Sequence, residues 1–191
     1  MTLPIEASIL LLRHGAFERT LDAEGRQQET LLEAGRTQAD ALAARLQAAD
    51  RPVVLYAGRS GRAVRTAERI AERFRQPVYA EADLDEMRLP RHPDLAPSDT
   101  RPLWARSRQA PDAPAGPGAE TLRAAGQRGA RALSGAVRAN PGRLVVAVSH
   151  GGLIASTLAA LGAGAIDRDI AFGQCFLLTG TPLGLIAEDT P

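Results

Sequence analysis

The chain of 191 residues contains no lysine, so all 23 of its basic residues are arginine. This absence excludes every mechanism that depends on a lysine, including phosphate-binding loops that end in Gly-Lys. The chain also has a single cysteine, Cys175. One cysteine excludes an internal disulfide and a four-ligand zinc site built from cysteines. We interpret Cys175 as a small core residue in the last strand.

Long apolar runs and an excess of charge are missing as well. No run of about 18 apolar residues occurs, which excludes a membrane span. The net charge is only +1, so we expect neither nucleic acid nor a membrane as a partner. The first eight residues lack the basic start and cleavage site of a signal peptide, so we expect a cytoplasmic protein. The hydrophobic content of 45% suits a core, and the length suits one domain over residues 1–191.

Short apolar runs alternate with helical patterns along the chain. Runs without polar alternation are typical of strands in a parallel sheet that is covered on both faces. We expect such strands at residues 8–13, 52–57, 77–80 and 143–149, and a last or edge strand at 174–179. Apolar spacing predicts helices over 30–49, starting at a Thr30–Glu33 capping box, and over 63–74, 119–138 and 153–161. The predicted fold class is α/β, a three-layer α/β/α sandwich with a mostly parallel central sheet.

Residues 88–118 differ from the rest of the chain. They hold more than half of the prolines and the only tryptophan, Trp104, and show no clear periodicity. We therefore predict an irregular lid or insertion within the single domain. Its arginines would either attract a substrate with additional negative charge or form a solvated basic loop; they are Arg88, Arg91, Arg101, Arg106 and Arg108.

Two of the three histidines end predicted strands, and each is followed by glycine. In open parallel sheets, ligands bind beyond the carboxyl ends of the strands, so His14 and His150 would reach one crevice if their strands are neighbours. Gly151 would add a free backbone N–H at a helix N-terminus, which favours an anion. Arg62 lies in the first turn of the helix that the apolar spacing at 63–74 marks, where a bound anion would relieve its conflict with the helix dipole. Taken one at a time, either histidine is equally well explained as a solvated residue at a strand end.

The motif Leu-Leu-Arg13-His14-Gly15 resembles the signature of the histidine phosphatase superfamily, which includes the phosphoglycerate mutases. Further resemblances follow in the same order, from about residue 8 to residue 160, at 31–39, 56–67, 83–86, 118–121 and 148–152. The chain departs from the common pattern at residues 16–17, at Thr20, at 58–60 and after Glu86. These departures leave the phosphate-binding residues in place and leave the substrate class open.

The resemblance implies a phosphoglycerate mutase-like fold and a two-step phosphoryl transfer without metal or cofactor. His14 would be the nucleophile and His150 a second catalytic histidine. Arg13, Arg62, the Gly151 N–H and Thr20 would bind phosphate, with Thr20 at the position of an Asn in many relatives. Glu86 would donate the proton to the leaving oxygen, with Glu120 as the alternative.

We therefore expect a phosphatase that acts on a small phosphorylated metabolite. A phosphoglycerate mutase-type transferase and an inactive phosphate-binding module remain alternatives. A homodimer is also left open, because nothing in the sequence decides the oligomeric state.

Overall fold

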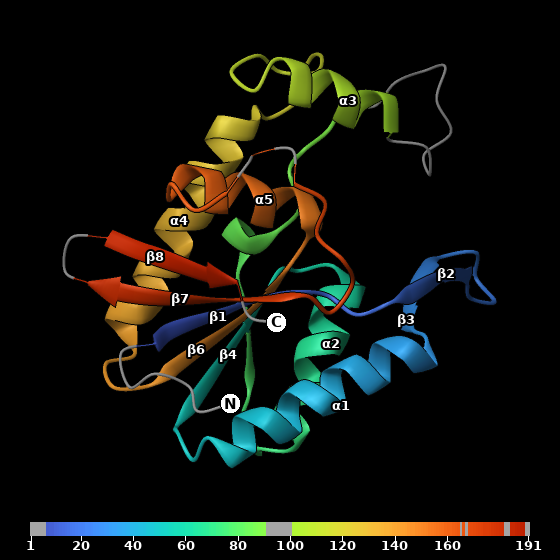
Figure 1. Ribbon diagram of the computed structural model, residues 1–191. Coiled ribbons are helices and arrows are strands. Elements are labelled where there is room, and N and C mark those ends of the chain that lie inside the picture. Colours follow the sequence, from blue (N-terminus) through green and yellow to red (C-terminus); the bar gives the residue numbers. More distant parts are fainter. Residues whose placement is uncertain (1–6, 91–100, 165, 167, 182–183, 190–191) are drawn as a thin grey trace.

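The computed structural model describes residues 7–90, 101–164, 166, 168–181 and 184–189 (Figure 1). A six-stranded sheet lies at its centre, in the order β5-β4-β6-β1-β7-β8. Its strands are β1 (Ala7–Arg13), β4 (Val53–Ala57), β5 (Val78–Ala80), β6 (Leu144–Ser149), β7 (Cys175–Thr181) and β8 (Gly184–Asp189). The first four strands of this order are parallel, whereas β7 and β8 are antiparallel to their neighbours. The predicted mostly parallel α/β sheet is confirmed.

Helices cover both faces of the sheet (Figure 1). α1 (Glu33–Ala48) and α2 (Gly61–Glu72) pack on one face, and α4 (Leu122–Ala139) and α5 (Gly151–Ala160) on the other. Alternate side chains of β1 belong to opposite cores: Leu10 and Leu12 face α1 and α2, whereas Ile9 and Leu11 pack with residues of α4 and α5. Because both faces are buried, the strands carry no polar alternation.

A hairpin that the sequence analysis did not predict extends away from the sheet (Figure 1). It consists of β2 (Phe17–Leu21) and β3 (Gln27–Leu31). Thr30 lies in β3 opposite Glu18, and α1 begins at Glu33 without a side-chain cap. The predicted capping box is therefore wrong. Most side chains of this two-stranded ribbon are exposed, so no buried stripe marks it in the sequence.

Part of the segment predicted to be irregular is helical. α3 (Arg101–Gln109) lies within residues 88–118, which corrects that expectation, while residues 91–100 lie outside the described part of the chain. Proline at the start of a helix costs little, because the first turn has no partner for its N–H. Leu103 and Ser107, four residues apart, form the buried face of α3. A single turn of 3₁₀ helix, η1 (Ala82–Leu84), precedes Glu86.

The end of the chain also differs from expectation, because β8 pairs outside β7 and takes the edge of the sheet. The described helices contain no segment with the length and apolar character needed to cross a membrane. The assignment of residues 1–191 to one domain stays a prediction.

Candidate active site

The register of the sheet brings the two predicted histidines together. Strands β1 and β6 are parallel neighbours, and Arg13 pairs with Ser149 at their carboxyl ends. The next residues, His14 and His150, leave the sheet at the same edge, and the backbone N–H of His14 donates to the carbonyl of Ser149 at 3.0 Å. Their ring centroids lie 5.2 Å apart. The two imidazoles therefore lie next to each other at one edge of the sheet, as expected for neighbouring strands.

His14 is held as a neutral imidazole with a defined tautomer. Its Nδ1 lies 3.0 Å from the carbonyl oxygen of Gly15, which can only accept, so the proton resides on Nδ1 and Nε2 carries a lone pair. Burial, reinforced by the charges of Arg62 and Arg13, lowers the pKa of His14 to about 4. An unprotonated Nε2 at neutral pH is what a nucleophilic histidine requires.

Arg62 links the two histidines. Its Nε donates to Nε2 of His14 at 3.1 Å, and its Nη2 lies 3.1 Å from Nδ1 of His150. Nδ1 of His150 must therefore accept, which leaves its proton on Nε2, 3.4 Å from the hydroxyl of Ser60. Burial and then the charge of Arg62 lower the pKa of His150 to about 2. Arg62 also bonds to Glu29, through Nη1 at 2.5 Å and through its backbone N–H at 3.0 Å.

Arg13 approaches the same point from β1. Its Nη1 donates to the carbonyl of Ile170, and its guanidinium carbon lies 4.0 Å from the centre of the Phe172 ring. Its Nε is buried and has no hydrogen-bond partner among the described residues. A Cβ atom on Gly151 would come within 3.5 Å of that Nε. An unsatisfied cationic donor beside the N-terminus of α5 is well placed to bind an oxyanion.

Glu86 lies at the N-terminus of α5. Its Oε1 accepts the backbone N–H groups of Leu153 and Met87, each at 2.9 Å, and its Oε2 accepts that of Gly152 at 3.3 Å. Burial raises the pKa of Glu86 and outweighs these bonds and the charge of Arg62. A raised pKa favours the protonated carboxyl group, which is the form that a general acid needs.

Glu120, the alternative acid, is held in a different way. Both of its oxygens accept from the Arg128 guanidinium, at 2.9 and 2.8 Å. Burial alone would raise the pKa of Glu120, but the bonds with Arg128 and its charge lower it. Arg128 also donates to the carbonyls of Asp83 and Asp85, so the pair supports the segment that leads to Glu86.

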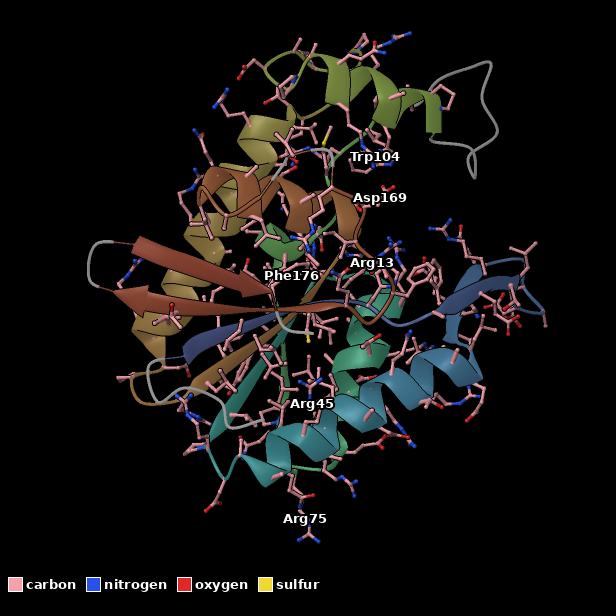
Figure 2. The ribbon with its side chains drawn as sticks, in the orientation of Figure 1. Arg13, Arg45, Arg75, Trp104, Asp169 and Phe176 are labelled. Carbon is pink, nitrogen blue, oxygen red and sulfur yellow. The ribbon has the colours of Figure 1, made fainter. Side chains whose placement is uncertain are left out.

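Two hollows meet at Glu86. One, of about 250 Å³, is bounded by Arg13, the glycines of α5, Trp104 and the residues around Asp169. Figure 2 shows Arg13, Asp169 and Trp104 in the region between the sheet and α3. The other, of about 490 Å³, is lined by Arg59, Ser60, Arg62, Asp85, Glu86 and His150. Glu86 lines both hollows, together with Arg13 in the smaller one and with Arg62 and His150 in the larger one.

Thr20 is the one predicted site residue that the structure does not bring to this centre. It is exposed on β2, opposite Gln28, and no contact joins it to Arg13, His14, Arg62 or His150 in the described residues. Its role in phosphate binding stays a prediction.

Glu29, Phe17 and Phe172 contact the centre and were not predicted. Phe17 lies edge-on to His14 with ring centroids 5.1 Å apart, and Phe172 stacks on Arg13. No local pattern marks them, because each is brought in by the hairpin or by the loop before β7. Within the described ranges, no group of three or more His, Cys, Asp or Glu side chains is arranged to hold a metal ion.

Comparison with known proteins shows the family of the chain and relatives of its fold. The family model of the histidine phosphatase superfamily (branch 1) matches residues 9–175, whereas no curated protein sequence matches the chain. The fold is similar to that of Bacillus stearothermophilus YhfR, with a TM-score of 0.76, 24% identity and 95% of each chain covered. A mycobacterial glucosyl-3-phosphoglycerate phosphatase complexed with inorganic phosphate has a TM-score of 0.70 and 27% identity, over 97% of this chain and 96% of that one.

An Entamoeba histolytica phosphoserine phosphatase, complexed with 3-phosphoglyceric acid, has a TM-score of 0.73 and 16% identity, with 96% of each chain covered. At this identity the likeness concerns the fold alone. The family match, in contrast, spans the strands and helices that carry His14, Arg62 and His150. The chain therefore belongs to branch 1 of the histidine phosphatase superfamily.

Proposed function

We propose that this protein is a phosphatase that hydrolyses a small phosphate monoester through a phosphohistidine on His14, without a metal ion. The observation that carries the proposal is the convergence of two neutral imidazoles and two guanidinium groups at the carboxyl edge of β1 and β6. The phosphatases among the structural relatives support the same class of reaction.

Phosphate binding would use donors that face the centre. Arg13 offers its unpartnered Nε, and Gly151 offers a backbone N–H at the start of α5. Arg62 would exchange its bond to Nε2 of His14 for a bond to a phosphate oxygen, which frees the nucleophile. Each charge-assisted hydrogen bond contributes about 1.5–3 kcal/mol. A nearby phosphate dianion would also favour protonation of His150, which could then donate to it.

In the first step, Nε2 of His14 attacks phosphorus as the bond to the leaving oxygen breaks. Glu86 gives its proton to that oxygen, so the alcohol leaves neutral. In the second step, the Glu86 carboxylate takes a proton from water, the water oxygen attacks phosphorus, and the N–P bond breaks. Inorganic phosphate is released, and His14 and protonated Glu86 are restored. The protein contributes mainly positioning and charge stabilisation.

The smaller hollow is where the leaving group would lie, because Glu86 and Trp104 form part of its wall. Arg108, Arg168 and Asp169 also line it. A volume of about 250 Å³ favours a leaving group of a few carbon atoms with polar substituents.

The experiment is turnover of p-nitrophenyl phosphate in the presence of EDTA, with His14→Ala as the comparison. We expect wild-type turnover, its loss in His14→Ala, and acid-labile, base-stable phosphate on the wild-type protein after quenching. No turnover, with phosphate or vanadate still bound, would instead identify an inactive binding module. Conversion of 3-phosphoglycerate that depends on 2,3-bisphosphoglycerate would identify a mutase.

A further inference from the structure

The feature that the mechanism leaves unused is the carboxylate of Glu29. Glu29 lies on β3, outside the central sheet, and its side chain is only 9% exposed. Burial would raise its pKa, but the hydrogen bonds from Arg62 and Arg19 and the charge of Arg62 lower it, so Glu29 is ionised. A negative charge beside a site that receives a phosphate dianion is unfavourable by itself. We therefore expect Glu29 to have a role that compensates for this unfavourable charge.

Glu29 binds Arg62 at two separate points. Oε1 accepts from Nη1 of the guanidinium at 2.5 Å, and Oε2 accepts from the backbone N–H of the same residue at 3.0 Å. The second contact satisfies one of the free N–H groups in the first turn of α2. The carboxylate also offsets the conflict between the Arg62 cation and the helix dipole. One side chain thus holds both the backbone N–H and the guanidinium group of Arg62.

Arg62 can still bind phosphate while Glu29 holds it in this way. A guanidinium has five N–H donors, and the contacts with His14, His150 and Glu29 use one each on Nε, Nη2 and Nη1. One hydrogen remains on each terminal nitrogen. Two terminal N–H groups suit a two-point contact with phosphate oxygens. Glu29 therefore restricts the guanidinium without consuming the donors that the substrate needs.

The hairpin restrains Arg62 from a second direction. The centre of the Phe17 ring, on β2, lies 5.1 Å from the guanidinium carbon of Arg62. A free arginine side chain has about 2 kcal/mol of rotamer entropy to lose when it is held. If that entropy is lost on folding, it is not lost again in the transition state.

We propose that Glu29 is a positioning residue that acts through Arg62 to align its guanidinium with the reacting phosphoryl group. This inference rests on the proposed function and deepens it. The opposite role, in which Glu29 competes with phosphate for Arg62, predicts effects of the opposite sign and is an outcome of the test.

The central variant is Glu29→Gln, and the matched control is Asp22→Asn. Glutamine keeps the size of the side chain but can no longer accept hydrogen bonds at both ends. Asp22 lies on the same hairpin, where it accepts from the backbone N–H groups of Glu24 and Arg26 and from the side chains of Arg26 and Gln28. It does not contact Arg62, so its loss loosens the hairpin only.

With p-nitrophenyl phosphate, we expect Glu29→Gln to lower kcat by about 10-fold to 10²-fold, with a smaller change in KM. Asp22→Asn should lower Tm and keep kcat/KM within about twofold of wild type. In an Arg62→Ala background, Glu29→Gln should have no further effect, because the two residues act as one unit. Wild-type kcat in Glu29→Gln, or an equal loss in Asp22→Asn, or independent effects in the double variant, would overturn the proposal.

Calorimetric binding of orthovanadate by the same variants separates this inference from the proposed function. We expect Glu29→Gln to bind vanadate at least tenfold more weakly than wild type, and Asp22→Asn to bind it equally well. Equal or tighter binding by Glu29→Gln would show that Glu29 does not position Arg62 and would favour the competing role. A wild type without turnover contradicts the phosphatase assignment alone, since the vanadate comparison still decides the role of Glu29.

Discussion

At the scale of single residues, the surroundings of two carboxyl groups shift their pKa values in opposite directions. Glu86 is buried at the start of α5 and has a raised pKa, whereas Glu120 is paired with Arg128 and has a lowered one. The raised pKa favours the protonated form of Glu86, which is the form that the proposed general acid needs, whereas the lowered pKa favours the ionised form of Glu120. The second holds the segment that carries the first.

Replacing Glu86 by Gln removes the transferable proton and keeps the shape of the side chain. We expect turnover of an alkyl phosphate ester to fall by about 10²-fold to 10⁴-fold, the range for loss of a general acid. The loss should be smaller with p-nitrophenyl phosphate, because p-nitrophenolate leaves without protonation. Steady-state kinetics on both esters measures the difference. An unchanged rate on the alkyl ester would mean that another group protonates the leaving oxygen.

At the scale of elements, α3 and α5 fit together only because residue 152 is glycine. A Cβ atom there would lie 1.8 Å from Cη2 of Trp104 and 2.8 Å from Oε1 of Glu86. The Trp104 ring thus lies against the N-terminal turn of α5, at the wall of the smaller hollow. The contact connects the position of α3 to the position of the proposed acid.

We expect Gly152→Ala to displace Trp104 and to lower kcat/KM by about 10-fold or more through misplacement of Glu86. Since Trp104 is the only tryptophan, its fluorescence emission should shift to longer wavelength as the ring enters water. Gly135→Ala is the control: it lies within α4, and nothing lies within 4 Å of its added Cβ. That variant should keep its activity and gain about 0.5–1 kcal/mol of stability. Unchanged fluorescence in Gly152→Ala would contradict the packing described here.

At the scale of the whole molecule, the two buried histidines make stability depend on pH. Burial lowers the pKa of His14 to about 4 and that of His150 to about 2, from an ordinary value of 6.5. Between these values and 6.5, the unfolded chain binds more protons than the folded one. The folded state is therefore favoured above pH 6.5 and loses stability as the pH falls through 6.5 toward 4 and below.

We expect the urea-unfolding free energy of wild type to decrease between pH 7 and pH 4, with a contribution from His14 of roughly 3 kcal/mol. His14→Asn removes one titrating group, so its stability should fall less over the same range. The difference between the two curves isolates the contribution of His14 from those of the carboxyl groups. Parallel curves would show that His14 is protonated as easily in the folded protein as in the unfolded chain.

Much of the fold and of the site could be predicted from local pattern. Leu10 to Leu12 and Val145 to Val148 are continuous apolar runs, which predict buried strands. A polar residue directly after such a run is expected at the carboxyl edge of the sheet. This rule predicted that His14 and His150 lie together if their strands are neighbours, and the pairing of β1 with β6 meets that condition.

Other features left no such pattern. The β2–β3 hairpin is mostly exposed, so its apolar periodicity is weak, and Thr30 was assigned to a helix although it lies in β3. Helix α3 was not predicted, because the prolines around it obscured its periodicity. Glu29 lies far along the chain from Arg62, and nothing in its neighbours indicates the ion pair.

The sequence by itself determined the family and the layered α/β architecture, and it identified four candidate side chains for phosphate binding, because these depend on short-range hydrophobic runs and ordered motifs. Only the tertiary structure decided which carboxylate pairs with which arginine. It also decided that Thr20 lies away from the centre and that Trp104 covers the start of α5. The physical reason is that ion pairs and close packing depend on distance in space, whereas a linear pattern records only neighbours along the chain.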